Sequence, residues 1–114
     1  MHIQVLYFKG CPNYLAAIGN LNAALHALSM SKSTTVEPRE IKTQAEAEAK
    51  HFIGSPTFII EGLDMFGEPS SLTYGLRCRT YVLDGRMVSV PTQADFAEHL
   101  RVLTKRPRPQ SKPR

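Results

Sequence analysis

The N-terminal run HIQVLYF is apolar on both of the faces that a strand would present. Ile3, Val5 and Tyr7 point to one side of such a strand, and Leu6 and Phe8 make the other side apolar as well. A strand with two apolar faces has to be covered on both sides. The pattern therefore predicts the central strand of a sheet in an α/β protein.

The spacing of apolar residues along the rest of the chain predicts the element order β-α-β-α-β-β-α. After the first strand we expect a helix over 13–28, a strand over 36–41, a short helix over 43–52, strands over 57–62 and 77–83, and a final helix over 91–104. Helices join the first three strands, so the sheet should be parallel or mixed. We expect a four-stranded mixed sheet flanked by helices, with the fourth strand antiparallel to the third.

Local signals support individual elements. The apolar face of the first helix has steps of three and four, at Leu15, Ile18, Leu21, Leu25 and Leu28. Pro38 places its strand at a sheet edge, because proline cannot donate to a ladder. Thr43 and Glu46 form a capping box, and Asp84-Gly85 is a turn signal.

The composition is that of a single globular domain. Of the 114 residues, 42% are apolar and 21% are charged, and we assign residues 1–104 to one domain. No run of about 18 apolar residues is present, which argues against a membrane span. The N-terminus lacks a basic stretch and a small-residue cleavage site. We therefore expect no signal peptide and a cytoplasmic location, where thiols stay reduced.

The net charge of +4 comes from a basic tail, residues 105–114. Without this tail, nine basic and ten acidic residues leave the body at −1. Three prolines and a lack of large apolar residues exclude the tail from a core, so we expect it to be disordered. It is either a solvated end or an arm that touches nucleic acid or another anionic surface. The body does not interleave aromatic and basic residues, so nucleic acid is not an expected partner.

Two motifs carry a resemblance to a known fold family. The motif CPNY, residues 11–14, joins the first strand to the first helix, and SPT, residues 55–57, opens the third strand. With the element order, they resemble the thioredoxin fold over nearly all of residues 1–104. The resemblance implies that Cys11 and Pro56 are catalytic, with a cis peptide bond before the proline lying against the cysteine. The residues it places at the substrate are Tyr14, Ser55 and Thr57.

The stretch GLRCRTY, residues 75–81, adds a resemblance to a group of small bacterial thioredoxin-like proteins, some of which are labelled as alkylmercury lyases. The chain departs from thioredoxins where Tyr14 replaces the second cysteine of the CxxC pair. A single thiol can attack a disulfide and form a mixed disulfide, but it cannot close a local disulfide to release the product. Release would need an external thiol such as glutathione, or Cys78.

Cys11 has a physical reason to be reactive. A thiol at a helix N-terminus faces unsatisfied N–H groups and the positive end of the helix dipole, which favour the thiolate and lower its pKa from about 8.5. Pro12 suits the first helical position, and Lys9 could add positive charge. The alternative is a small apolar residue that fills a turn. Pro12 and the Ser55-Pro56 pair favour the reactive thiol.

Cys78 could be either a second redox residue or a buried, inert cysteine. Alternation separates two strand faces, Cys78, Thr80 and Val82 on one and Arg77, Arg79 and Tyr81 on the other. Pro56 should lie at the Cys11 end of the sheet, whereas the expected fourth strand enters from the far end. Five residues of strand cover about 16 Å, but bridged Cα atoms lie within about 7 Å. We therefore expect Cys78 to reach Cys11 only if residues 63–75 fold back along the sheet.

The remaining candidates carry less weight. Tyr14 either shields the Cys11 thiolate or packs on the first helical turn. Arg77 and Arg79 form either an anion site or a strand face that is solvated or ion-paired. We favour the solvated or ion-paired face. Two cysteines and scattered histidines cannot close a structural zinc site, so we expect no cofactor and no resident metal.

Three function classes remain open. The first, which we favour, is a monothiol thiol–disulfide oxidoreductase or redox sensor that uses Cys11 on a thiol- or disulfide-bearing protein or glutathione. The second is a soft-metal or organomercurial-handling protein, for which Cys11, Cys78 and Asp64 are the available set. The third is a non-catalytic thioredoxin-like module that binds an extended peptide beside Pro56. The fold alone does not decide among them.

Overall fold

The first strand takes the central place that its two apolar faces predict. The structure is a computed structural model that describes residues 1–67 and 73–105. The strands of the main sheet are β1 (His2–Tyr7), β2 (Thr35–Glu40), β3 (Thr57–Ile60) and β4 (Leu63–Asp64). Their order is β2-β1-β3-β4, with β1 parallel to β2 and antiparallel to β3, and β4 antiparallel to β3. The predicted four-stranded mixed sheet is confirmed, and Pro38 lies on an edge strand.

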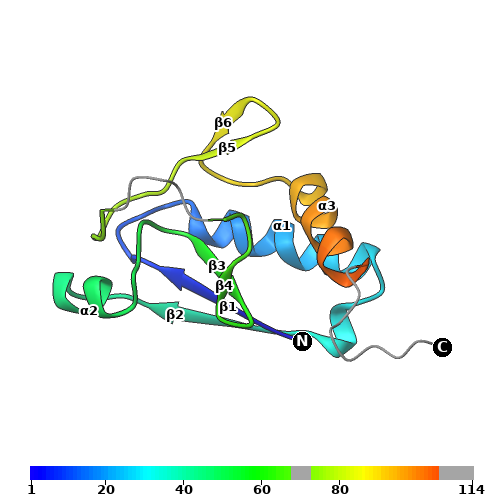
Figure 1. The fold of residues 1–114 in the computed structure, drawn as a ribbon, viewed down its shortest axis with the longest axis horizontal. Helices are drawn as coiled ribbons and strands as arrows, with labels where there is room; N and C mark the ends of the chain where they lie inside the picture. Colours follow the sequence, from blue (N-terminus) through cyan, green and yellow to red (C-terminus); the bar gives the residue numbers. More distant parts are fainter. Residues whose placement is uncertain (68–72, 106–114) are drawn as a thin grey trace.

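Helices cover the two faces of this sheet unequally. They are α1 (Tyr14–Ala27), α2 (Gln44–Ala49) and α3 (Gln93–Lys105), with a 3₁₀ turn, η1 (Ser31–Ser33). Figure 1 shows α1 and α3 side by side, and both contribute to the larger core with Ile3, Val5 and Phe58. Strand alternation turns Leu6 to the opposite face, where it meets Phe52 in a smaller core that includes α2.

Aromatic rings join the larger core to the later part of the chain. Phe58 and Phe96 meet edge to face with ring centroids 4.8 Å apart, and Phe66 meets Tyr81 in the same way at 5.0 Å. Such pairs contribute about 0.5–1.5 kcal/mol beyond their buried area. Phe66 also meets Phe96 edge to face at 5.5 Å, so these rings connect β3, α3 and Tyr81.

The predicted fourth strand over 77–83 is wrong in its extent and in its partner. Only its last three residues form a strand, β5 (Tyr81–Leu83), which pairs with β6 (Arg86–Val88) in a separate two-stranded sheet. Asp84 and Gly85 between them have φ of 53° and 76°, so the predicted turn is confirmed. Figure 1 shows this hairpin standing apart from the main sheet.

The edge of β3 is filled by the residues that directly follow it. β4 pairs there, and the Met65 N–H continues the contact by donating to the Phe58 carbonyl at 2.7 Å. The later segment therefore finds no open edge beside β3, which is why the expected fourth strand does not form in the main sheet.

The first helix begins one residue later than predicted, and it turns the predicted apolar face inward except at Leu15. It starts at Tyr14 with Asn13 as its N-cap residue, so Cys11 lies in the preceding turn. The buried positions are Ala17, Leu21, Ala24 and Leu25. Leu15 is 68% exposed, contrary to the predicted face, because two residues before Ala17 is about 200° around the helix.

The predicted capping box at the start of α2 is confirmed. The Glu46 N–H donates to Thr43 Oγ1 at 3.0 Å, and the Glu46 carboxylate accepts from the Lys42 N–H at 2.9 Å. The helix ends at Ala49 rather than at residue 52, and the chain then turns through His51 with φ of 55°.

The predicted basic tail lies almost wholly outside the described residues. Lys105 is the last residue of α3, and residues 106–114 follow it. Within 1–67 and 73–105, the structure contains no helix with the length and apolar content that a membrane crossing requires.

Candidate functional site

Cys11 lies in the turn between β1 and α1 and is almost fully buried. The residue is 1% exposed, and its N–H closes the turn by donating to the Phe8 carbonyl at 2.9 Å. Its sulfur donates to the Ser55 carbonyl at 3.5 Å. The expected contact with helix N–H groups is corrected: in the described part of the chain, the polar partners of this sulfur are a carbonyl and a second thiol.

That second thiol is Cys78, so the expectation that it lies far from Cys11 is wrong. The two sulfurs are 2.9 Å apart, and Cys78 Sγ donates to Cys11 Sγ. Both cysteines are free, and Cys78 is exposed rather than buried. A disulfide bond brings sulfurs to about 2.05 Å, so the two sulfurs would move by only about 1 Å if an oxidant removed two electrons and joined them.

The direction of the chain around Cys78 explains the error. The Ser55 N–H donates to the Arg77 carbonyl at 2.8 Å, and the Arg79 N–H donates to the Ser55 carbonyl at 2.9 Å. Residues 77–79 therefore pair with Ser55 in parallel, whereas the prediction assumed an antiparallel strand beside β3. Because β3 begins where β1 ends, pairing at this point brings Cys78 to the turn that holds Cys11.

A glycine permits this pairing, which lies next to a cis peptide bond. The Ser55–Pro56 bond is cis, as the resemblance implies. A Cβ added to Gly54 would lie 2.7 Å from Arg79 Cβ and 2.9 Å from Arg79 Cα, and the Gly54 φ of 151° is one that side-chain-bearing residues rarely adopt. Gly54 thus permits the close approach of residues 77–79 to the chain before Pro56.

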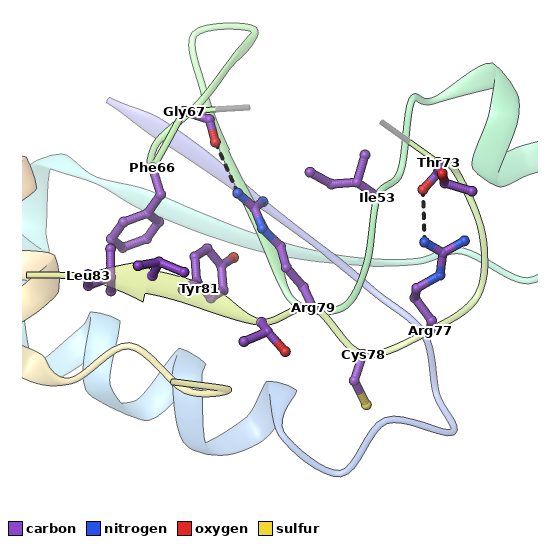
Figure 2. Close-up of a pocket in the computed structure, with 11 residues that line it drawn as sticks. Ile53, Phe66, Gly67, Thr73, Arg77, Cys78, Arg79, Tyr81 and Leu83 are labelled. Carbon is purple, nitrogen blue, oxygen red and sulfur yellow. Dashed lines mark hydrogen bonds between the residues drawn. The ribbon is translucent and has the colours of Figure 1, made fainter. Parts of the chain in front are cut away.

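Arg79 anchors the segment that carries Cys78, residues 73–81, on the side after the thiol. Its guanidinium pairs with Asp64 at 2.7 Å and donates to Thr57 Oγ1 at 3.2 Å and to the Gly67 carbonyl at 3.1 Å. The side chains of Arg79 and Asp64 are only 8% and 4% exposed. Figure 2 shows Arg79 and Cys78 pointing to opposite sides of the segment, so the anchor and the thiol do not compete for space.

Tyr81 ties the same segment to the cis proline. Its hydroxyl donates to the Pro56 carbonyl, and the Arg79 guanidinium lies 4.2 Å from its ring centroid. Burial raises the pKa of Tyr81 far above its ordinary value, so the hydroxyl remains a donor throughout the physiological pH range.

The residues just before Cys78 are hydrogen-bonded to α2 and to the connection that follows α2. The Gly75 N–H donates to the Phe52 carbonyl at 3.0 Å, and the Gln44 side chain donates to the Tyr74 carbonyl at 2.9 Å. The Tyr74 ring stacks on His51 with centroids 5.0 Å apart. The segment is therefore held on both sides of Cys78.

The thiol pair keeps a proton on Cys78. The hydrogen bond to Cys11 is the main cause that raises the pKa of Cys78 above its ordinary value near 9.0, followed by partial burial and by repulsion from negative charge on Cys11. Two thiolates at 2.9 Å would repel each other strongly. At neutral pH, Cys78 is therefore mostly the S–H donor of the pair.

A cavity of about 430 Å³ runs along residues 77–83. The described residues that line it include Ile53, Phe66, Thr73, Arg77 and Cys78 (Figure 2). In Figure 2 the Cys78 sulfur points toward the turn before α1. The exposed thiol thus lies between open space on one side and Cys11 on the other.

The residues expected at the substrate are engaged within the chain. Thr57 is 2% exposed, and its hydroxyl donates to the Gly54 carbonyl at 2.6 Å. The Ser55 backbone is paired with residues 77–79, which occupy the place beside the proline expected for an extended peptide. The Ser55 hydroxyl is buried and has no hydrogen-bond partner among the residues described. Tyr14 stacks on Tyr7 with centroids 4.1 Å apart, which is the packing role.

The carboxylate considered for metal chemistry does not join the thiols. Asp64 pairs with Arg79, whose side chain points away from the Cys78 sulfur (Figure 2). Over residues 1–67 and 73–105, no three or more potential metal ligands gather at one place. The set of Cys11, Cys78 and Asp64 expected for organomercurial chemistry is not assembled.

Sequence reasoning left an ion pair open for this strand face but did not identify Asp64 as the partner of Arg79. It grouped Arg77 and Arg79 on one strand face, yet Arg77 is exposed while Arg79 is buried with Asp64. The one local signal was Gly54, because a glycine directly before the SPT motif indicates a close backbone approach. Nothing in the sequence indicates which segment makes that approach.

No protein-family model, curated protein or solved structure matches this chain.

Proposed function

We propose that this chain is a thiol–disulfide exchange protein of the thioredoxin-like type, with Cys11 and Cys78 as its redox pair. The observation that carries the proposal is the 2.9 Å between their sulfurs. Two thiols this close turn the release of a bound substrate into an intramolecular step. The missing cysteine of the CxxC motif is then no obstacle, because Cys78 supplies the second thiol from a distant part of the sequence.

The surroundings of Cys11 support the thioredoxin-like assignment. Cys11 follows the central strand, and its sulfur contacts the carbonyl of Ser55, which precedes Pro56 through a cis bond. The sheet has α1 and α3 on one face and α2 on the other. These features agree with the resemblance of the CPNY and SPT motifs to that family.

In the proposed reaction, the Cys78 thiolate attacks one sulfur of a disulfide in a partner protein or in oxidised glutathione. A bond forms between Cys78 Sγ and that sulfur, and the other substrate sulfur leaves as a thiolate that takes up a proton. Cys11 then attacks Cys78 Sγ, which closes the Cys11–Cys78 disulfide and releases the first substrate sulfur as a thiol. Two electrons and two protons pass from the protein to the substrate.

We assign the first attack to Cys78 because it is the exposed thiol, in place of the Cys11 attack expected from the sequence. An incoming disulfide meets Cys78, whereas Cys11 is 1% exposed. The raised pKa of Cys78 makes this attack slow at neutral pH and faster as the pH rises. Resolution by Cys11 needs no access for the substrate, only the short distance to Cys78.

The test is the fate of both thiols in oxidised glutathione. The protein is incubated with it, quenched with acid, alkylated with N-ethylmaleimide and analysed by peptide mass spectrometry. We expect the two thiols to disappear together, with the peptides of Cys11 and Cys78 joined by a bond that dithiothreitol cleaves. We expect Cys11→Ser to accumulate a mixed disulfide on Cys78.

A different pattern would overturn the proposal. Glutathione adducts on wild-type protein that never resolve into a Cys11–Cys78 bond would show that the pair does not exchange. Accumulation of the adduct on Cys11 in Cys78→Ser, faster than on Cys78 in Cys11→Ser, would reverse the assigned order of attack.

A further inference from the structure

We infer that Arg79, held by Asp64, is a positioning residue that sets Cys78 opposite Cys11. This inference deepens the proposed function and rests on it. Arg79 contacts neither sulfur, and its side chain points away from Cys78 (Figure 2). It acts through the backbone, because it is the residue next to the exposed thiol.

The side chain of Arg79 is fixed by three groups that come from outside its own segment. Asp64 ends β4, Thr57 opens β3, and Gly67 supplies a carbonyl from the residues that follow β4. A guanidinium presents its donors in a rigid fork, so contacts in several directions define its position and orientation. Since both charged side chains are nearly excluded from water, this pairing is screened little by solvent.

The backbone of Arg79 is fixed as well. Its N–H donates to the Ser55 carbonyl at 2.9 Å, the same carbonyl that accepts from the Cys11 sulfur. Its Cα and Cβ lie against Gly54, where no larger residue fits. The carbonyl of Ser55 is thus the point at which the Cys11 turn and the Cys78 segment meet.

Arg77 gives a matched comparison on the other side of Cys78. Its side chain is exposed, and its guanidinium donates to the Thr73 carbonyl of the same segment at 3.1 Å. Both arginines are one residue from the thiol and carry the same charge. Of the two arginines, Arg79 is the one whose side chain connects the segment to the main sheet, so Arg79 and not Arg77 should control the distance between the sulfurs.

The quantity that reports this distance is the effective concentration of one thiol toward the other. The protein dithiol and oxidised glutathione exchange to give the protein disulfide and two molecules of reduced glutathione. The ratio of squared reduced to oxidised glutathione at half-oxidation measures that effective concentration. It falls when the segment that carries Cys78 samples positions away from Cys11.

The experiment compares this ratio in wild type, Arg79→Met and Arg77→Met. We expect Arg79→Met to lower it at least about tenfold, since a misplacement of about 1 Å can cost about 100-fold in an intramolecular step. We expect Arg77→Met to stay within about twofold of wild type, as surface substitutions usually do. Equal ratios in Arg79→Met and wild type would overturn the positioning role.

Two further variants protect the test from a simple loss of folding. Arg79→Met leaves Asp64 buried without its partner, so the double variant Arg79→Met with Asp64→Asn removes both charges together. We expect the double variant to fold, judged by circular dichroism, and still to show the lowered ratio. Arg79→Lys should give an intermediate ratio, because an ammonium can pair with Asp64 but cannot reproduce the fork.

The outcomes separate the inference from the proposed function. If wild type forms the Cys11–Cys78 bond and all Arg79 variants match it, the redox pair stands and the positioning role falls. If wild type never forms the bond at any glutathione ratio, the proposed function falls and takes the positioning role with it. A folded double variant with the wild-type ratio would also refute the role of the ion pair.

Discussion

The two segments that carry the thiols reach the same site by different physical means. Cys11 sits between β1 and α1, two regular elements whose backbone bonds and apolar faces hold the turn from both ends. Residues 77–79 make two backbone hydrogen bonds to Ser55, two residues before β3, and these form an isolated bridge outside the main sheet. The rest of their attachment comes from a few side chains, chiefly those of Arg79 and Tyr81.

This difference predicts where the site is vulnerable. A turn between regular elements shares its position with many backbone bonds and core contacts, so one side chain contributes little to it. A segment held by a single bridge depends on each anchor. Substitutions that reach the anchors of Cys78 should therefore disturb the site more than substitutions around Cys11 of similar size.

The largest expected effect comes from removing the partner of a buried charge. Asp64→Ala leaves the Arg79 guanidinium buried at 8% exposure without a counter-charge. We expect a loss of about 3–5 kcal/mol in the free energy of unfolding, measured by urea titration. Glu98→Ala, at an exposed position on α3, is the control and should change it by less than about 0.5 kcal/mol. A loss no larger than that of the control would contradict the anchoring role.

The next effect tests the close approach at Gly54. Gly54→Ala places a Cβ 2.7 Å from Arg79 Cβ, so the segment has to move away. We expect a loss of about 1–3 kcal/mol in unfolding free energy, as for other overpacked sites. Disulfide formation between Cys11 and Cys78 should slow in the same variant. An unchanged rate with lowered stability would show that the segment adjusts without moving its thiol.

Gly19 provides the matched control for that substitution. It lies on the exposed side of α1, and an added Cβ meets nothing within 4 Å. Gly19→Ala should therefore stabilise the protein by about 0.5–1 kcal/mol, because alanine loses less backbone entropy in a helix. Destabilisation in the same urea titration would mean that the face of α1 is assigned wrongly.

A smaller effect concerns acid stability far from the thiols. Burial alone would raise the pKa of Asp95, but hydrogen bonds from the Thr92 backbone and hydroxyl groups and the Arg86 guanidinium outweigh it and lower that pKa below its ordinary value of 3.8. The ionised carboxylate thus stabilises the fold at pH values above its ordinary pKa. This stabilisation is lost as the pH falls through the lowered pKa. Asp95→Asn should flatten the stability profile below about pH 4. A profile unchanged from wild type would contradict this.

The last expected effect concerns the reactivity of Cys78 rather than the stability of the fold. Cys11→Ala removes the acceptor of the Cys78 S–H, which is the main cause of its raised pKa. The midpoint of the Cys78 alkylation rate against pH should therefore move down toward the ordinary value near 9.0. Iodoacetamide kinetics followed by peptide mass spectrometry measure it. A midpoint that stays in place would mean that the sulfurs do not interact in solution.

Much of the fold could be predicted from the sequence because the signals are local. Two apolar faces specify a central strand, Pro38 an edge strand, the Thr43 capping box a helix start and Asp84-Gly85 a tight turn. Each of these depends on residues within a few positions of one another. The extent of β5 and the exposure of Leu15 on α1 were predicted less well, because both depend on what packs against them.

Half of the candidate site followed from such local patterns, and half did not. The sequence by itself determined that a cysteine follows the central strand and that a Ser-Pro pair opens β3. Only the tertiary structure decided that Cys78, 67 positions along the chain, lies 2.9 Å from Cys11. The physical reason is that a single parallel bridge leaves no repeating pattern of apolar residues in the sequence. Its position depends on a glycine that allows close approach and on an ion pair between Arg79 and Asp64.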